Sequence, residues 1–382
     1  MMPIVVMAHA RPASLERLLA SVAAMDRPAG TELVVLLDPG SPVQRDVERV
    51  VAACDWPADR LELIEADRPL GLVGNFRRVG ELAEQRGPLL LLEDDLEVAP
   101  GAHRWAEAIV DRYRSDPLVA GATLNALWFN GFSHRPFEPI PDGTDVFFAA
   151  VPWYQGMVVT PEWWRIWWRQ PSAAVDLHPV YDTFAEEEWF PEVARNVAGA
   201  GRFFVYPRVS QAINHGEAGV HFADRTSWFQ TPLERRFGEP RLCSAAQSLA
   251  RYDQYLEYDV KLLAEALNLG SGDLPLVDLT ATRPLPAEGG LLTVRPTNSA
   301  TRTWGSSRRP LEANVLDDCA GSVVSLTDAT AIDRSSRARW ATDHLLDLAA
   351  GHGRAASLRV QLRSRLAARS LRRGAPGTGG SE

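Results

Sequence analysis

The sequence has few cysteines and no long hydrophobic run. None of its three cysteines forms a Cys-x-x-Cys pair, which excludes a disulfide framework and a cysteine-based zinc site. We therefore expect a reducing, cytoplasmic location. No segment approaches the roughly 18 consecutive apolar residues that cross a bilayer, and no basic region precedes the short apolar run near the N-terminus. We expect neither a membrane-spanning helix nor a secretory signal.

Positive charge is scarce except at the end of the chain. The sequence holds 40 Lys and Arg against 49 Asp and Glu, a net charge of −9, which argues against a nucleic-acid partner. Residues 333–382, by contrast, contain ten arginines and four acidic residues. Two interpretations of this Arg-rich segment stay open. One is peripheral contact with an anionic membrane, at its inner face, and the other is a solvated helix, which is favoured because Arg365 and Arg369 interrupt the leucine face.

The first 125 residues alternate short apolar runs with segments of helical period. This pattern is typical of βαβ units and predicts an α/β fold with a mostly parallel sheet. The expected strands cover residues 3–9, 32–38, 61–67, 88–94 and 119–125. Two crossover helices are indicated by apolar residues three and four positions apart. Their apolar faces comprise Leu15, Leu18, Leu19 and Val22 in the first helix, and Leu72, Phe76, Val79 and Leu82 in the second.

The chain becomes irregular and rich in aromatic residues after residue 125. Expected strands cover 145–150, 156–160 and 203–207, and expected helices cover 161–169, 185–197 and 232–268. The turn-forming sequence LGSGDLP then predicts a domain boundary near residue 270. Helical spacing pairs Trp163 with Trp167 and Trp164 with Trp168, so one pair is expected to pack inward.

Polar side chains follow the expected strands, where an open α/β sheet places its ligand crevice. These residues are His9 and Arg11, Asp38, Asp67 and Arg68, and the acidic triplet Glu93, Asp94 and Asp95. Three consecutive carboxylates repel one another unless a cation lies among them, and Mg²⁺ or Mn²⁺ suits oxygen ligands. Carboxylates that only cap the next helix are the alternative, but Pro100 and Gly101 begin that helix too late.

Four stretches of the chain resemble the GT-A glycosyltransferases, in particular bacterial relatives of N-acetylglucosaminyltransferase I. The stretches are PIVVMAHARPASLERLLASV, the long segment around LLLLEDDLEVAPG, WYQGMVVTPEWW and FFVYPRVSQAINHGEAGVH, in that order within residues 3–222. The resemblance implies a Rossmann-like GT-A domain over residues 1–270. The remainder is then expected to be a small β-rich module (271–334), a helical Arg-rich segment (335–373) and a disordered tail (374–382).

The resemblance also assigns roles to the residues of the donor site. Asp95 corresponds to the metal ligand of a DxD-type motif, and Glu93 and Asp94 to its partners at the ribose and the metal waters. Arg11 and Asp38 correspond to contacts with the nucleotide base.

Two further motifs follow from the same resemblance. Asn75 and Arg77, which precede the triplet, are expected to contact the nucleotide or its diphosphate. Asn214, Gly216, Gly219 and His221 match an N-x-G-x-x-G-x-H pattern, and His221 is expected to reach the metal or the diphosphate. A surface-loop histidine is the alternative for His221.

The general base is expected within HPVYDTFAEEEWF. Asp182 matches the base of inverting family members, although Tyr181 replaces their tryptophan. Glu186, Glu187 and Glu188 compete with it for the role. The alternative is that Asp182 only precedes the helix expected from residue 185.

The resemblance implies a metal-dependent, inverting glycosyltransferase that uses Mn²⁺ or Mg²⁺ and a nucleotide-diphospho-sugar, expected to be a UDP-sugar. The acceptor is expected to be a glycan or a lipid-linked molecule, in glycan or polysaccharide synthesis, and Trp153 is the better candidate among the tryptophans to line its groove. Two alternatives stay open. One is a catalytically inactive nucleotide-sugar-binding or scaffold protein, which the altered Trp-Asp segment favours. The other is a nucleotidyltransferase, which the absence of a Gly-rich, basic phosphate loop disfavours.

Overall fold

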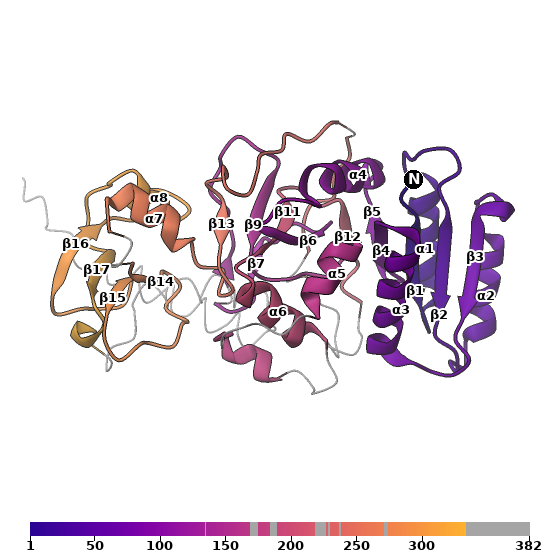
Figure 1. The fold of residues 1–382 in the computed structure, drawn as a ribbon, viewed down its shortest axis with the longest axis horizontal. Coiled ribbons are helices and arrows are strands. Elements are labelled where there is room, and N and C mark those ends of the chain that lie inside the picture. The colour runs from indigo at the N-terminus through magenta and orange to yellow at the C-terminus, as the bar shows by residue number, and fades with distance from the viewer. Residues whose placement is uncertain are drawn as a thin grey trace, which may run out of the picture.

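A nine-stranded mixed sheet is the centre of the molecule. The structure is a computed structural model that describes residues 1–133, 135–168, 175–183, 189–217, 227, 230–236, 238–270 and 274–333. The strand order is β13-β9-β11-β6-β10-β4-β1-β2-β3 (Figure 1). In this order the strands are Arg251–Tyr252, Val146–Ala149, Phe203–Pro207, Val119–Thr123, Met157–Val159, Leu89–Glu93, Ile4–Ala8, Leu33–Leu37 and Leu61–Glu65.

The strands β4, β1, β2 and β3 run parallel, while β10 is antiparallel to both of its neighbours, β4 and β6. The strands β1 and β2 consist of apolar residues and are buried along their whole length, which explains why they lie inside the sheet with both faces covered. The expected α/β fold with a mostly parallel sheet is thus confirmed, and each expected strand forms with its ends shortened by at most two residues.

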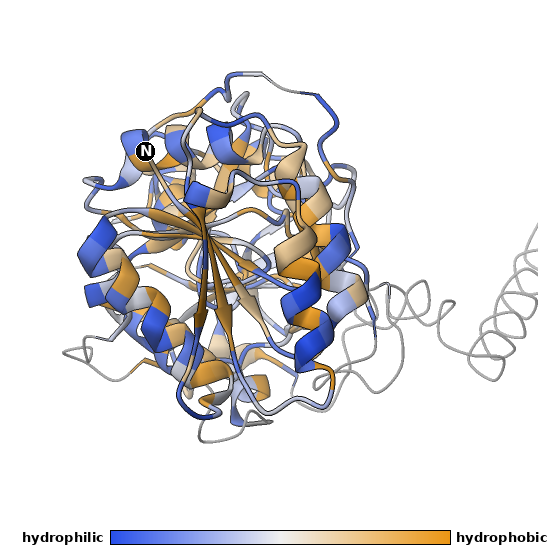
Figure 2. Cartoon of the chain, turned by 90° about the vertical axis from the view of Figure 1, so that its right-hand side faces the viewer, coloured by the Kyte–Doolittle hydropathy of each residue, from blue (hydrophilic) through white to orange (hydrophobic). Residues whose placement is uncertain are grey.

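Six helices accompany this sheet: α1 (Pro12–Ala23), α2 (Gln44–Ala53), α3 (Gly71–Arg86), α4 (Ala102–Tyr113), α5 (Pro161–Trp167) and α6 (Phe190–Gly199). Figure 2 shows the apolar strands at the centre and amphipathic helices on both sides of them. The predicted apolar faces of α1 and α3 are buried except for Leu72, which is 45% exposed. Leu72 belongs to the first turn of α3, beyond the carboxyl edge of the strands, so no strand covers it.

Helix α5 packs against the sheet and against α3 through its tryptophans. Trp163 and Trp167 are buried, as the helical spacing predicts for one pair, and the Trp167 indole N–H donates to the Ala120 carbonyl at 2.5 Å. Trp164 lies against Gly80 of α3, where a Cβ would come within 1.8 Å of the indole. A glycine is therefore required for this close contact between the two helices.

A second, four-stranded sheet forms after residue 275. Its order is β14-β15-β17-β16, built from Leu276–Asp278, Gly290–Thr293, Val324–Asp328 and Ala300–Trp304. The helices α7 (Val260–Leu267) and α8 (Ala313–Leu316) contact each other beside it. Figure 1 places this sheet at the opposite end of the molecule from β1–β3.

Short elements complete the described chain. They are β5 (Leu96–Val98) paired with β12 (Ala212–Asn214), β7 (Phe129–Asn130) paired with β8 (Arg135–Pro136), and the 3-10 turns η1 (Ala58–Arg60), η2 (Pro179–Thr183) and η3 (Ala329–Ala331). No helix among the described residues is long and apolar enough to cross a membrane.

The expected helix over 232–268 is wrong for most of its length. Only α7 is helical there, while Tyr252 belongs to the edge strand β13 and Leu256 adopts a φ of 57°. Pro232, Gly238 and Pro240 break the preceding stretch, so the helical spacing of its apolar residues is coincidental. The expected helix at 185–197 begins at Phe190, and residues 184–188 lie outside the described residues. The expected Arg-rich helix and tail after residue 333 also lie outside them.

Candidate donor site at the strand ends

The order β3-β2-β1-β4 creates a switch point between β1 and β4, because the chain passes from β1 to β2 on one side and returns to β4 on the other. In open α/β sheets, ligands bind in the crevice outside the carboxyl ends of the strands at such a point. His9 and Arg11 follow β1 there, and Glu93 ends β4 immediately before Asp94 and Asp95. The structure thus brings the basic and acidic candidates to the same edge.

Direct contacts join these residues. The Arg11 guanidinium donates to Asp95 Oδ2 at 2.6 Å and lies 3.9 Å from Asp94 Oδ1. The backbone N–H of His9 donates to Asp94 Oδ2 at 3.2 Å. The hydrogen bond between Arg11 and Asp95 is short and charge-assisted, which makes it one of the stronger kinds of polar contact in proteins. Arg11 and the triplet therefore form one cluster.

The cluster carries more negative than positive charge. Burial, together with the charges of Asp95 and Asp94, raises the pKa of Glu93 to about 8. Burial and the charge of Asp95 raise the pKa of Asp94 to about 6, although Arg11 and the His9 N–H oppose the shift. A single guanidinium thus does not balance three neighbouring carboxyl groups, and a bound cation would relieve the repulsion.

The donor chemistry of this cluster suits a hard divalent ion. Asp94 and Asp95 present carboxylate oxygens at the carboxyl edge of the sheet, with side chains 14% and 25% exposed. Mg²⁺ is commonly held by one or two carboxylates, with substrate phosphates and water as its other ligands. Among the described residues, no group of three or more His, Cys, Asp and Glu side chains is arranged to hold a metal ion. The two aspartates alone would supply one or two ligands, as in sites where substrate phosphates and water complete the coordination.

Asp38 forms hydrogen bonds within the fold that its position in the sequence does not predict. Its carboxylate is buried and accepts hydrogen bonds from the backbone N–H groups of Leu70 (2.7 Å) and Gly71 (3.1 Å) at the start of α3. Its carbonyl oxygen contacts His9 Nδ1 at 2.9 Å. Asp38 therefore ties the end of β2 to both α3 and β1. Its contact with a nucleotide base remains a prediction.

Among the described residues, Asn75 and Arg77 form no hydrogen bond or ion pair with Arg11 or the triplet. The Asn75 amide donates to the Gly71 carbonyl at 3.0 Å and accepts from Arg78 at 3.2 Å. The Arg77 guanidinium lies over the Trp168 ring at 5.6 Å. Arg78 also reaches the Ile64 carbonyl at 3.5 Å, near the carboxyl end of β3. Arg78 thus lies at the ligand edge of the sheet, a position that the sequence analysis did not single out.

The segment after β12 crosses beside the triplet. Asn214 pairs with Leu96, the residue after Asp95, and accepts a hydrogen bond from the Gly216 N–H at 3.0 Å. Gly216 has a φ of 59°, which glycine adopts without strain. Gly219 and His221 lie outside the described residues, so the predicted role of His221 has no structural counterpart here.

Glu217 anchors this segment to the start of α1. It accepts hydrogen bonds from the Ser14 hydroxyl at 2.6 Å and the Arg17 guanidinium at 2.5 Å. His215, two residues earlier, lies 3.2 Å from Glu97. Sequence reasoning missed these residues, because nothing in a motif two hundred residues away indicates which helix it will contact. The only signal was their place beside the expected Asn214 and Gly216.

Asp182, the predicted general base, is an exposed residue of η2. Among the described residues, no hydrogen bond or ion pair links it to the triplet. Tyr181 beside it is buried against the rings of Phe132 and Phe190, with centroids 5.8 and 5.4 Å away. Glu186, Glu187 and Glu188 lie outside the described residues, so the choice among these carboxylates stays open.

Trp153, the predicted acceptor-site residue, is half-buried. Its ring stacks on Tyr154 at 5.9 Å between centroids, and Tyr154 in turn contacts Phe190 edge to face at 4.7 Å. This aromatic group is continuous with the packing of Tyr181 on Phe190. The predicted acceptor residue and the predicted base thus border one aromatic cluster.

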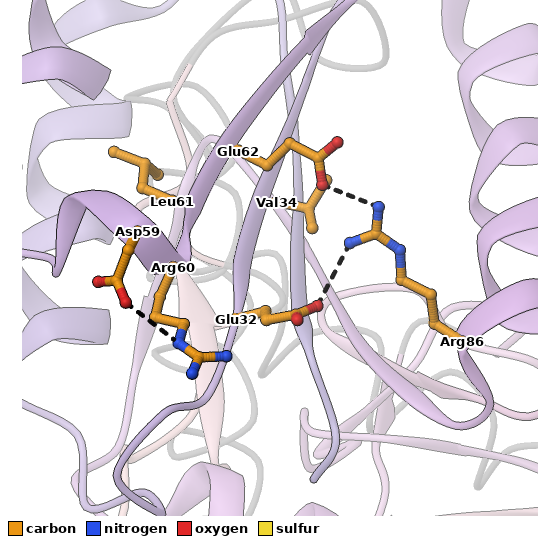
Figure 3. A pocket seen from close by; sticks show the side chains of 7 residues that line it. All are labelled: Glu32, Val34, Asp59, Arg60, Leu61, Glu62 and Arg86. Atoms are coloured by element: carbon orange, nitrogen blue, oxygen red, sulfur yellow. Dashed lines mark hydrogen bonds and ion pairs between the residues drawn. The ribbon is translucent and has the colours of Figure 1, made fainter.

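A pocket of about 470 Å³ lies at the amino ends of β2 and β3 (Figure 3). Arg86 bridges Glu32 at 3.4 Å and Glu62 at 2.8 Å on its wall. Glu32 directly precedes β2, and Leu61, another lining residue, begins β3. The pocket is therefore at the end of the strands opposite to the triplet and does not belong to the donor site.

No family model and no curated protein matches the chain. Solved structures do match. TarS from S. aureus is 16% identical with a TM-score of 0.33, over 54% of this chain and 60% of that chain. GalNAc-T7 with UDP, GalNAc and Mn²⁺ is 14% identical with a TM-score of 0.40, over 56% of this chain and 43% of that chain.

The mannosyltransferase PcManGT from Pyrobaculum calidifontis, in complex with GDP-Man and Mn²⁺, is 14% identical with a TM-score of 0.37. That alignment covers 54% of each chain. The chain thus spans about half the length of these proteins.

Proposed function

We propose that this chain is a metal-dependent, inverting glycosyltransferase. It moves a sugar from a nucleotide-diphospho-sugar, with a UDP-sugar as the first candidate, to an acceptor hydroxyl in glycan or polysaccharide synthesis. The observation that carries the proposal is the meeting of Arg11 with Glu93, Asp94 and Asp95 at the switch point between β1 and β4. Nucleotide ligands bind at this point in open α/β sheets.

The residues of the cluster suit the two halves of a nucleoside diphosphate. Arg11, which the resemblance assigns to the nucleotide base, offers a guanidinium that can also form paired hydrogen bonds with phosphate oxygens. Asp95, with Asp94 beside it, would hold Mn²⁺ or Mg²⁺, which neutralises the charge that develops on a departing diphosphate. The Asp38 carboxylate fixes α3 against β2, and the Glu217 anchor fixes the 212–217 segment against α1. These contacts order the walls of the crevice before the donor binds, which reduces the entropy cost of binding.

The acceptor side of the proposal depends on Asp182. In an inverting displacement this carboxylate takes the proton of the acceptor hydroxyl as that oxygen attacks the anomeric carbon. Its exposure keeps it accessible to an incoming acceptor. A nucleotide-sugar-binding protein without turnover is the second candidate, because Tyr181 is buried beside Asp182 where the resembling family has tryptophan.

Thermal unfolding with a panel of nucleoside diphosphates tests the first step. Each nucleotide is added with Mn²⁺, Mg²⁺ or EDTA, and a ligand that binds the native state stabilises it by about 2.7 kcal/mol at a hundredfold excess over its Kd. We expect one nucleotide to raise the melting temperature only when metal is present. Stabilisation by no nucleotide under any condition would contradict the proposal.

Asp95→Asn and Asp55→Asn form a matched pair for this experiment. Asp55 is exposed and precedes β3, so it lies at the edge of the sheet opposite to the triplet. Asp95→Asn should abolish the metal-dependent part of the shift, and Asp55→Asn should retain it. Release of nucleoside diphosphate from the identified donor then separates a transferase from a binding protein without turnover.

A further inference from the structure

Trp128 is an exposed residue within a buried stretch of the chain. Every other residue of 119–130 is buried, whereas Trp128 is 45% exposed. Tryptophan is highly buried on average in folded proteins, because its ring carries a large apolar surface. Among the exposed large hydrophobic side chains of the described residues, Trp128 is the only aromatic one. Its ring therefore offers a flat apolar surface to a ligand.

Hydrogen bonds fix the position of this ring. The Trp128 indole N–H donates to the Arg208 carbonyl at 3.3 Å, and the Trp128 carbonyl accepts from the Phe137 N–H at 2.8 Å. Arg208 is itself held, because its guanidinium donates to the Ile140 carbonyl at 2.7 Å and to Asp142 at 3.0 Å. The ring thus has little freedom to lose when a ligand binds, which reduces the entropy cost of binding.

Trp128 lies at the same edge of the main sheet as the acidic triplet. Arg208, whose carbonyl holds the indole, directly follows β11, and β11 runs parallel to β6. Because β10 is antiparallel to both β6 and β4, the strands β11, β6 and β4 all end at one edge. Three strand spacings separate β11 from β4, which at about 4.8 Å each is roughly 14 Å across the sheet. This separation leaves room for a donor sugar and one acceptor unit between the triplet and the ring.

The hairpin of β7 and β8 connects Trp128 with the segment of the proposed base. The hairpin begins directly after Trp128, and its Phe132 ring stacks on His178 at 4.8 Å between centroids. The same ring lies 5.8 Å from Tyr181, which directly precedes Asp182 in η2. The segment that carries Asp182 therefore packs against the hairpin that follows Trp128.

We propose that Trp128 binds the acceptor by stacking on the apolar face of a sugar ring, so that the acceptor is a saccharide of two or more units. The C–H groups on that face are slightly positive and contact the negative face of an indole. Exposed polar side chains for the sugar hydroxyls are available nearby, where Leu233 bridges Ser210 and is followed by Arg235 and Arg236. The inference rests on the proposed function and narrows its acceptor from any hydroxyl compound to a glycan chain.

The apolar surface around Trp128 is too small for a protein partner. Among the exposed large hydrophobic side chains of the described residues, only Val209, at 37% exposure, also belongs to the two segments that hold the ring. A stable protein interface buries about 800 Å² on each partner and depends on several anchors near its centre. One ring beside one valine instead matches a single sugar unit.

Binding to an array of immobilised monosaccharides and oligosaccharides tests the proposal with the full chain, with and without UDP and Mn²⁺. We expect the natural chain to bind at least one oligosaccharide, whose affinity is then measured by calorimetric titration. Trp128→Ala should weaken that affinity about tenfold, because it removes the stacking surface. Trp128→Phe should retain most of it, since phenylalanine keeps an aromatic face although it cannot donate to the Arg208 carbonyl.

Leu63→Ala is the matched control. It removes a large apolar side chain that is 40% exposed, on the edge strand β3, and should bind the oligosaccharide like the natural chain. Binding of no oligosaccharide, an unchanged affinity in Trp128→Ala, or equal losses in Trp128→Ala and Trp128→Phe would each overturn the proposal. The metal-dependent rise in melting temperature with nucleotide should persist in Trp128→Ala. A failure of the stacking proposal is therefore distinct from a failure of the proposed function, in which that rise is absent from the natural chain.

Discussion

Arg11 and Asp95, which are 84 residues apart, form an ion pair in which the guanidinium Nη1 lies 2.6 Å from the carboxylate Oδ2. This ion pair links the segment after β1 to the segment after β4 at the switch point of the sheet. It also gives the acidic triplet its nearest positive charge. If Asp95 holds a divalent ion, that ion and Arg11 compete for the same carboxylate. Binding of metal and diphosphate would then free the guanidinium to contact phosphate oxygens.

Arg11→Gln should therefore weaken nucleotide binding. Loss of a charge-assisted contact costs about 1.5 to 3 kcal/mol, so we expect the nucleotide Kd to rise roughly tenfold to a hundredfold. Nucleotide titrations followed by thermal unfolding in Mn²⁺ measure this change. Arg114→Gln is the control, because Arg114 is exposed and precedes β6, at the edge of the sheet opposite to the triplet. Equal affinities of the two variants would remove Arg11 from the donor site.

Asp38→Ala should destabilise the fold as well as alter the site. The carboxylate accepts two backbone hydrogen bonds at the start of α3, where the helix dipole also favours negative charge. Loss of a comparable helix cap costs about 0.5 to 2 kcal/mol, measured as the free energy of unfolding in denaturant. Asp67→Ala, at an exposed position, should change it by less than about 0.5 kcal/mol. A variant of full stability that fails to bind nucleotide would instead assign Asp38 to the base.

Asp182→Asn should separate binding from turnover. Removal of a general base lowers rates by about 10² to 10⁴, whereas a nucleotide bound at the triplet does not depend on this side chain. We expect an unchanged nucleotide-induced rise in melting temperature and a loss of sugar transfer of that size. Asp176→Asn, also exposed and six residues earlier, is the control. Full turnover by Asp182→Asn would move the role to one of the glutamates at 186–188.

The sequence predicts those parts of the fold that depend on residues close together in the chain. Apolar runs such as PLLLL at 88–92 are compatible with few structures other than a buried strand, and the rule that ligand residues follow strands then brings Arg11 and Asp95 together. The contacts of Glu217 with Ser14 and Arg17 have no local cause, because they join positions 203 and 200 residues apart. The spacing of Tyr252, Leu256 and Val260 led to the wrong prediction of a helix over 232–268. The same spacing arises here because a strand, a turn and the start of a helix each bury one of these residues in turn.

Gly80→Ala tests the close contact between α3 and α5. A Cβ at Gly80 would lie 1.8 Å from the Trp164 indole, so the ring or the helix must move. Overpacking of this kind costs about 1 to 3 kcal/mol in the free energy of unfolding, more than the gain in helix propensity from alanine. Gly131→Ala, where no atom lies within 4 Å of the added Cβ, should be nearly neutral. Trp164→Leu should restore part of the lost stability in the Gly80→Ala background, and a lack of any rescue would contradict this packing.

Glu312→Gln should change how stability depends on pH. Burial raises the pKa of Glu312 from 4.5 to about 7, although its hydrogen bond from Tyr252 favours the ionised form. Because the folded state binds this proton more tightly than the unfolded state, the contribution of Glu312 to stability is full below about pH 4.5. That contribution is lost as the pH rises from about 4.5 to 7.

Glutamine keeps an oxygen that accepts from Tyr252 and never ionises, so the variant should escape this loss. At pH 8 it should be more stable than the natural chain by up to about 3 kcal/mol, and at pH 4 the two should be nearly equal. Denaturant unfolding at both pH values measures the difference, which isolates Glu312 because the other titrating groups are common to both proteins. Glu288→Gln, at an exposed position, should show no such pH dependence. A Glu312→Gln variant that is less stable at pH 8 would mean that Glu312 is held ionised by its surroundings and that its charge stabilises the folded state.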